Sequence, residues 1–224
     1  MTGMLASVNS LEEALIVQQA QVEIIDLKQP ERGALGALDL EVVREIVLKI
    51  KQQMPVSATV GDLEMQPELV FNAVQAMAAT GVDYVKIGIF PNGDIFATLE
   101  KLKGLTAQGS ALIAVLFADN PLDLNLVAAI KAAGFTGVML DTMQKKSGSL
   151  TQLLSIEEIK NFVTLAQQAQ LLCGLAGSLR ENDIQILLPL GADYLGFRGA
   201  LCQQHNRAGQ LDFAAIQRIK QAMS

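Results

Sequence analysis

The chain has 224 residues, of which 50% are hydrophobic, and its formal net charge at pH 7 is -6. This size and apolar content are sufficient for one well-packed α/β domain spanning residues 1–224. An acidic chain with no basic stripe argues against nucleic acid as a partner, although a locally basic pocket could still hold a phosphorylated substrate. One histidine in the whole chain excludes a His-rich metal site.

The N-terminal residues, the longest apolar run and the cysteines indicate the cellular compartment of the protein. Residues 1–10 lack the basic and apolar regions of a signal peptide. The longest apolar run, residues 112–118, is too short to cross a bilayer. Cys173 and Cys202 have no metal-ligand spacing and are interpreted as buried free thiols. These features predict a cytoplasmic protein with no membrane partner.

Short apolar runs alternate with amphipathic stretches along the chain. Capping boxes are predicted at Ser10 with Glu13 and at Ser155 with Glu158. The predicted strands are residues 4–8, 22–29 (stopped by Pro30), 55–61, 84–89, 111–118, 137–142, 171–178 and 194–200. The predicted helices are residues 11–21, 40–50, 67–81, 95–108, 121–133, a stretch from 155 onward, 181–190 and 211–223.

About eight strand–helix units in this length predict a (β/α)₈ barrel with a parallel sheet. The alternative is an open, doubly wound sheet. That alternative is weaker because the first strand–helix turn lacks a Gly-x-Gly-x-x-Gly fingerprint and the number of units fits closure.

Lysines and aspartates collect at the predicted strand exits, where barrels of this type place their active sites. Asp26 and Lys28 are two residues apart and share one face of their strand, Lys86 lies in the fourth strand, and Asp141 ends the sixth. Desolvation and a second cation lower the pKa of a lysine, whose neutral amine can then form a Schiff base. The aspartates could orient the amines or move protons. Alternatively, a buried Asp–Lys pair only braces the barrel.

The exits of the seventh and eighth strands are rich in glycine. Gly177, Ser178, Gly199 and Ala200 could present backbone amides to a phosphate. Arg198 could add a cation there, or could instead pair with a neighbouring carboxylate.

Other polar residues have simpler interpretations. Ser57 and Thr59 are expected to be small fillers of the barrel interior, and Asp119 is expected to cap the helix near Pro121. His205 is expected to be a solvated surface residue.

Seven motifs, in order along nearly the whole chain, resemble (5-formylfuran-3-yl)methyl phosphate synthase, also called 4-(hydroxymethyl)-2-furancarboxaldehyde-phosphate synthase. The motifs are IIDLKQP (24–30), GALG (33–36), PVSATVGD (55–62), DYVKIG (83–88), LDT (140–142), LAGSL (175–179) and GFRGA (196–200). Members of this family are (β/α)₈ barrels related to Schiff-base aldolases. They join two molecules of glyceraldehyde 3-phosphate and eliminate phosphate and water. The furan product feeds the synthesis of methanofuran or a related cofactor.

The resemblance implies that Lys28 is the Schiff-base lysine and that Lys86 and Lys145 are further catalytic lysines. It implies acid–base roles for Asp26 and Asp141, and no metal or organic cofactor. Lys145 lies four residues after Asp141, as the family pattern requires, but Lys146 is adjacent and the choice between them stays open.

Two other functions remain open. One is a different aldolase or isomerase acting on phosphosugars; the other is a non-catalytic phosphate-binding barrel. Apolar residues on the outer helices further predict a homo-oligomer.

Overall fold

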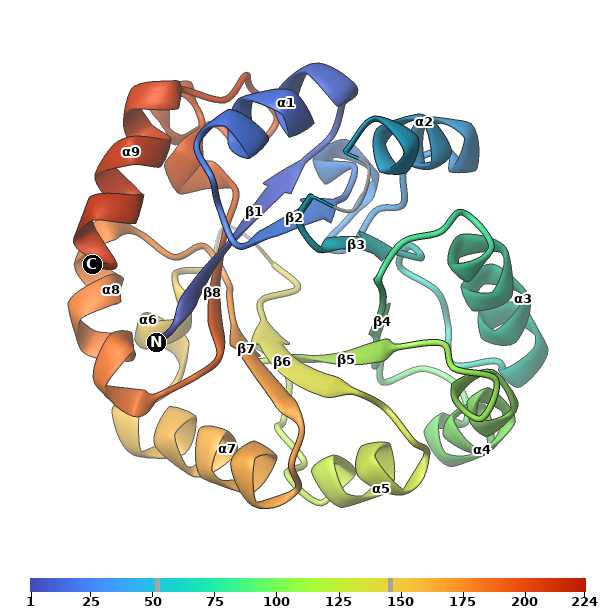
Figure 1. The fold of residues 1–224 in the computed structure, drawn as a ribbon. Helices are drawn as coiled ribbons and strands as arrows, with labels where there is room; N and C mark the ends of the chain where they lie inside the picture. The colour runs from blue at the N-terminus through green and yellow to red at the C-terminus, as the bar shows by residue number, and fades with distance from the viewer. Residues whose placement is uncertain (51–52, 145–146) are drawn as a thin grey trace.

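The computed structural model describes residues 1–50, 53–144 and 147–224. Eight parallel strands close into a barrel in chain order, with β8 paired to β1 (Figure 1). This closure confirms the predicted (β/α)₈ fold over an open sheet. The strands are β1 (Gly3–Val8), β2 (Ile24–Leu27), β3 (Val56–Thr59), β4 (Tyr84–Gly88), β5 (Leu112–Phe117), β6 (Gly137–Asp141), β7 (Leu172–Leu175) and β8 (Tyr194–Phe197).

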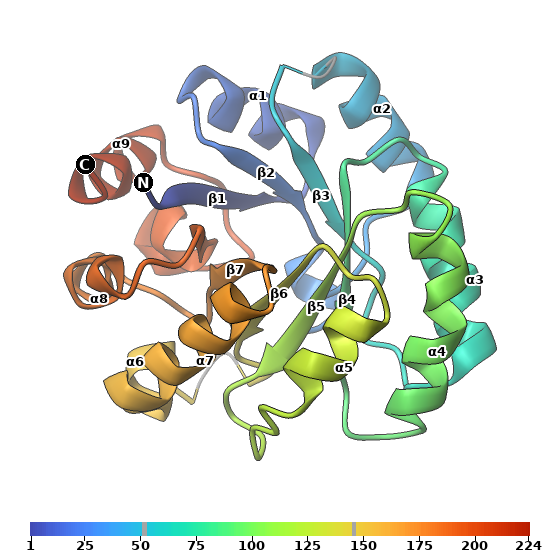
Figure 2. The same ribbon diagram turned by 60° about the horizontal axis from the view of Figure 1, so that its bottom comes forward.

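Helices between successive strands form an outer layer around the barrel, as Figures 1 and 2 show. Short 3₁₀ helices at Pro30–Arg32, Leu188–Leu190, Gly199–Leu201 and Gln203–His205 lie in the connections. The α-helices are α1 (Leu11–Gln19), α2 (Leu40–Ile50), α3 (Pro67–Ala78), α4 (Ile95–Thr106), α5 (Leu126–Ala132), α6 (Leu150–Leu153), α7 (Ile156–Gln168), α8 (Glu181–Leu187) and α9 (Phe213–Ala222). In the ranges given above, no helix is both long and apolar enough to cross a membrane.

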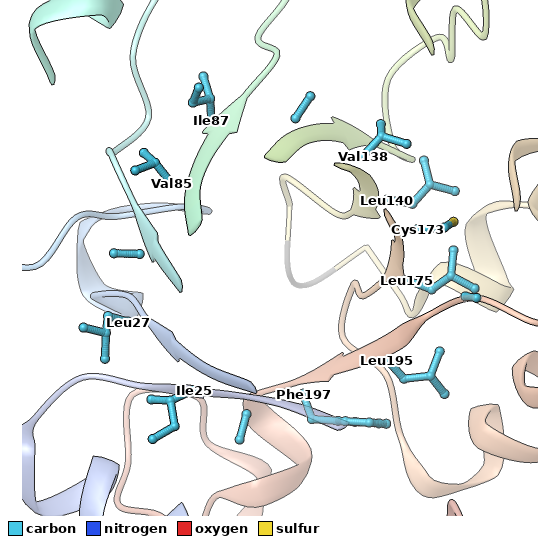
Figure 3. Packing of buried hydrophobic residues seen from close by; sticks show 14 of the residues in the cluster. Ile25, Leu27, Val85, Ile87, Val138, Leu140, Cys173, Leu175, Leu195 and Phe197 are labelled. Carbon is cyan, nitrogen blue, oxygen red and sulfur yellow. The ribbon is translucent and has the colours of Figure 1, made fainter. Parts of the chain in front are cut away.

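Alternation along the strands separates an apolar outer face from a mixed inner face. Ile25 and Leu27 on β2, and Val85 and Ile87 on β4, belong to the core between the strands and the helices (Figure 3). Successive side chains of a strand point to opposite faces. The charged residues that alternate with these four therefore point into the barrel.

The barrel interior is packed near the starts of the strands. Tyr194 and Ile113 are buried there, and Tyr84 packs against the same cluster. A Cβ on Gly174 would lie 2.3 Å from the Tyr194 ring, so only glycine lets this ring fill the barrel. The packing closes this end, and open space remains at the other, where the strands end.

Both cysteines are free and buried, as predicted. Burial raises the pKa of the Cys173 thiol to about 12. Because a thiolate is the reactive form, Cys173 is inert at neutral pH.

Some predicted boundaries are wrong. Helix α5 begins at Leu126, five residues after the predicted start, because the Asp123 carboxylate accepts a hydrogen bond from the Asn125 amide (2.9 Å) and closes a turn first. Strand β7 is shorter than predicted, and helix α6 was not predicted.

One of the two capping boxes is only half formed. Ser155 and Glu158 form the reciprocal pair that was predicted. Ser10 accepts from the Glu13 amide (3.2 Å), but the Glu13 carboxylate accepts from the Asn9 amide (2.9 Å) instead of capping Ser10.

Candidate active site

A pocket of about 640 Å³ opens at the carboxyl ends of the strands. Of the ten predicted site residues, Ala200 is buried beside the pocket without lining it, and Lys145 lies outside the described residues. The other eight line this one pocket: Asp26, Lys28, Lys86, Asp141, Gly177, Ser178, Arg198 and Gly199. The structure therefore brings together charged residues from β2, β4 and β6 and the glycine-rich exits of β7 and β8.

Asp26 and Lys86 form the deepest ion pair of the pocket. Lys86 Nζ lies 3.0 Å from Asp26 Oδ1, and the two residues are 2% and 0% exposed, respectively. Asp26 also accepts hydrogen bonds from the hydroxyls of Ser7 (2.8 Å) and Ser57 (2.7 Å). The sheet register sets this arrangement, because Ser7 on β1 and Ser57 on β3 stand on either side of Asp26. Ser57 is a small buried residue inside the barrel, as predicted, and it also donates a hydrogen bond to this carboxylate, which was not predicted.

The charge state of Asp26 follows from these neighbours. Burial alone would raise the pKa of its carboxyl, whereas the ammonium groups of Lys86 and Lys28 lower it. Hydrogen bonds from Ser57 and Ser7 lower it further, and the resulting pKa lies below the ordinary value of 3.8. Asp26 is thus an anion at neutral pH.

Lys28 forms a second ion pair, closer to the pocket mouth. Its Nζ lies 3.6 Å from Oδ2 of Asp141, and both side chains are more than nine-tenths buried. Asp141 Oδ1 accepts from the Thr142 amide (2.7 Å), which fixes the carboxylate. The sequence placed Asp26 and Lys28 on one face of their strand, with Asp26 as an acid–base residue. Lys28 pairs with Asp141 and Asp26 pairs with Lys86, while the charge of Lys28 still lowers the pKa of Asp26.

The guanidinium of Arg198 contacts a carboxylate and three backbone carbonyls of the protein. Its Nη1 and Nη2 form a bidentate ion pair with the Glu13 carboxylate of α1. Its remaining donors reach the carbonyls of Ser7 (3.2 Å), Arg207 (2.8 Å) and Gly209 (3.0 Å). All five N–H groups of the guanidinium are therefore engaged. Pairing with a carboxylate was the alternative left open by the sequence; phosphate binding by Arg198 stays a prediction.

The exit of β7 has an unusual backbone conformation. Gly177 has φ +108° and Ser178 has φ +50°, a conformation that residues other than glycine seldom adopt. A Cβ on Gly177 would lie 2.8 Å from the Thr142 side chain, so glycine allows this loop to approach the end of β6. Phosphate binding by Gly177, Ser178, Gly199 and Ala200 stays a prediction.

Two other acidic residues shape the pocket rim. Asp62, just after β3, accepts from the amides of Ala34 (2.8 Å) and Leu35 (2.7 Å), and so fixes the loop after β2. Asp119 accepts from the amides of Met143 (2.8 Å) and Gln144 (2.6 Å). It braces the loop after β6, and the prediction that it caps a helix is wrong.

Sequence reasoning missed Arg180 and Arg207, which also line the pocket. They lie in the polar segments that follow β7 and β8, beyond the few residues counted as strand exits. His205 is exposed, as predicted, but it belongs to the pocket rim. Extending the search for cations further into these two loops would have found both arginines.

Replacing Asp26 by asparagine is expected to lower the free energy of unfolding by about 2 kcal/mol at neutral pH, because Lys86 then loses its buried anionic partner. The folded-state pKa of Asp26 lies below 3.8. Its stabilising effect is therefore complete above pH 3.8 and is lost as the pH falls through the lower folded-state value. Urea unfolding of both proteins from neutral pH down to about 3 measures the difference. A difference that does not shrink on acidification would contradict this charge assignment.

Comparison with solved structures supports the fold. A 3-hexulose-6-phosphate synthase structure has a TM-score of 0.69 at 18% identity and covers 100% of both chains. The phosphoribosyl anthranilate isomerase of Thermus thermophilus has a TM-score of 0.68 at 11% identity, covering 100% of this chain and 98% of its own. At these identities the likeness shows the barrel alone.

Comparison of sequences is more specific. The family model described as 4-HFC-P synthase matches residues 4–220. A protein of Methylorubrum extorquens is 39% identical over 221 residues, covering 98% of this chain and 91% of its own. The (5-formylfuran-3-yl)methyl phosphate synthase of Methanopyrus kandleri is 34% identical over 235 residues, covering 99% of this chain and 98% of its own. The match to the family model over nearly the whole chain, with relatives more than 30% identical, shows that the chain belongs to the 4-HFC-P synthase family.

Proposed function

We propose that this protein is a lyase that joins two molecules of glyceraldehyde 3-phosphate through a Schiff base on Lys28. Elimination of phosphate and water then leaves 4-(hydroxymethyl)-2-furancarboxaldehyde phosphate, a precursor for methanofuran-type cofactors. The observation that carries the proposal is a buried lysine at the pocket, with Lys28 Nζ 3.6 Å from an Asp141 carboxylate oxygen. Membership of the synthase family supports the choice of product.

Lys28 is suited to attack an aldehyde. Its side chain is more than nine-tenths buried and lines the pocket, and a primary amine forms an imine with a carbonyl once it has lost its proton. Asp141 can accept the proton that the ammonium must lose. Attack on the carbonyl carbon of one substrate forms a carbinolamine, and loss of water gives the imine. The imine draws electrons from the neighbouring carbon, so a proton can leave that carbon to give an enamine.

The enamine carbon then attacks the aldehyde of the second substrate and forms the new carbon–carbon bond. Ring closure and aromatisation require the loss of phosphate and water, so protons must move at several neighbouring atoms. Lys86 and Asp26, 3.0 Å apart in the deepest part of the pocket, are the second acid–base pair for these steps. Lys145 is proposed as a third catalytic lysine from the family resemblance alone.

Product analysis tests the proposal. Incubation with glyceraldehyde 3-phosphate as the sole substrate is expected to give a furan aldehyde, seen by its ultraviolet absorbance and by mass spectrometry, together with released phosphate. A reaction without enzyme controls for spontaneous decay of the triose phosphate. A phosphorylated sugar without any furan would indicate another aldolase or isomerase. No reaction at all would favour a non-catalytic phosphate-binding barrel.

A further inference from the structure

Arg207, in the segment after β8, lines the pocket, and its guanidinium reaches the loop after β2. It is partly buried and lines the pocket with Lys28 and Asp141. Its Nη2 donates to the Gly33 carbonyl (3.2 Å), in the loop after β2. Its Cβ lies beside the β8 exit, 3.9 Å from the point where a Cβ on Gly199 would stand, whereas its guanidinium lies at the β2 loop.

The position of Arg207 is set by other residues and not by its own flexible stem. Its backbone carbonyl accepts from Arg198 Nε (2.8 Å), and Arg198 is paired with Glu13. On the opposite loop, Asp62 fixes the two residues that follow Gly33 through the Ala34 and Leu35 amides. Both ends of the contact are therefore anchored, which preorganises the guanidinium over the pocket.

The charge around Arg207 is suited to an incoming anion. Burial is the largest influence on the pKa of its guanidinium and lowers it; Asp141 and Asp62 raise it, Arg198 lowers it, and the net shift is downward. The guanidinium thus loses more hydration than its neighbours restore, and a bound anion would offset that loss. Within the described residues, the contact to Gly33 is the one hydrogen bond that its guanidinium donates to the protein, and a guanidinium has five donors in a fork that matches phosphate.

Arg180 has a separate position in the pocket. Its Nη1 lies 3.7 Å from the point where a Cβ on Gly199 would stand, so its charge lies beside the exit of β8. Three arginines line the pocket: Arg198 is fully engaged within the protein, the Arg180 guanidinium lies beside the β8 exit, and the Arg207 guanidinium lies at the β2 loop.

We propose that Arg207 binds the phosphate of the second glyceraldehyde 3-phosphate, the molecule that does not form the Schiff base. This inference rests on the proposed function, because only a reaction of two phosphorylated substrates needs two anion sites. The exits of β7 and β8, together with Arg180, then bind the phosphate of the first molecule, the one that forms the Schiff base. A pocket of about 640 Å³ lies in the size range typical of small-molecule sites and has room for both molecules.

The test compares occupancy of the first site with turnover. Borohydride trapping of Lys28 against substrate concentration reports binding of the first molecule, whereas the KM for furan formation also reports the second. R207M is expected to raise this KM by about 10-fold to 100-fold, the effect of losing a charged hydrogen-bonded contact. The concentration that gives half-maximal trapping should stay within about 2-fold of wild type. R207K should recover part of the loss, because it retains the charge without the planar fork.

R218M provides the matched control, because Arg218 is exposed on α9 and does not line the pocket. It should keep wild-type values for both measurements. Thermal unfolding of each variant establishes that the barrel is intact, and R207K keeps the test usable if R207M does not fold.

Three outcomes count against the inference in different ways. An unchanged KM in R207M overturns the second subsite and leaves the proposed function intact. If R207M raises the half-maximal trapping concentration as much as it raises the KM for furan formation, the assignment of Arg207 to the second molecule is overturned. No furan and no trapped adduct in the wild-type protein overturns the proposed function itself, and the inference with it.

Discussion

Replacing Lys28 by alanine is expected to lower the rate of furan formation by more than about a thousandfold, because the proposed imine forms on the Lys28 amine. Lys28→Arg should be equally inactive, since a guanidinium keeps a positive charge near Asp141 but cannot form an imine. The measurement is the initial rate of furan absorbance at saturating glyceraldehyde 3-phosphate.

Lys160 provides the matched control for this substitution. It lies exposed on the outer helix α7, so Lys160→Ala should retain the wild-type rate. Circular dichroism of each variant verifies the fold. If Lys28→Ala kept even a tenth of the wild-type rate, Lys28 would not be the nucleophile.

Replacing Arg198 by methionine is expected to have the largest effect on stability, a loss of about 4 kcal/mol in the free energy of unfolding. Arg198 is 7% exposed and its five donors join α1, the end of β1 and the loop after β8. The substitution leaves the Glu13 carboxylate, also 7% exposed, without its cation. Arg198→Lys should recover little of the loss, because one ammonium cannot replace a bidentate fork.

Urea unfolding measures this loss, and two further variants interpret it. The double variant with Glu13→Leu and Arg198→Met should lose less than the sum of the single losses, since removing both charges leaves none buried and unpaired. Arg44→Met removes the ion pair with Glu41 on the exposed side of α2 and should have no measurable effect. Wild-type stability in Arg198→Met, together with weaker phosphate binding, would instead identify Arg198 as the phosphate ligand that the sequence predicted.

The alternation of strands and helices was sufficient to predict the barrel, and the rule that barrel sites lie at strand exits was sufficient to collect Asp26, Lys28, Lys86 and Asp141 into one pocket. Both inferences depend on local periodicity and on a general property of the fold. They need no knowledge of which side chains touch.

Individual contacts were harder to predict, because they depend on residues far apart in the chain. Glu13 does not complete the capping box predicted at Ser10, because its carboxylate pairs with Arg198, which is 185 positions away in the chain. Asp26 contacts Lys86, 60 positions away, and not Lys28, two positions away on the same strand. In each case a closed barrel brings a distant side chain nearer than a neighbour in sequence, and local pattern carries no signal of that proximity.

The helix boundary at α5 was missed for a local reason. Proline at the first helical position is a common start signal. Here the Asx-type turn from Asp123 to Asn125 intervenes, and the helix begins at Leu126. The sequence therefore contains two possible starts for this helix, one at Pro121 and one after the turn at Asp123, and it does not show which of them sets the boundary.

The most direct measurement of the proposed chemistry is borohydride reduction of the protein during turnover of glyceraldehyde 3-phosphate, followed by peptide mass spectrometry. Reduction converts an imine to a stable amine and marks the lysine that formed it. The expected result is one modified peptide, containing Lys28 with a substrate-derived group. An adduct on Lys86 with Lys28 unmodified, or no adduct during active furan formation, would contradict the assignment of Lys28 as the Schiff-base lysine.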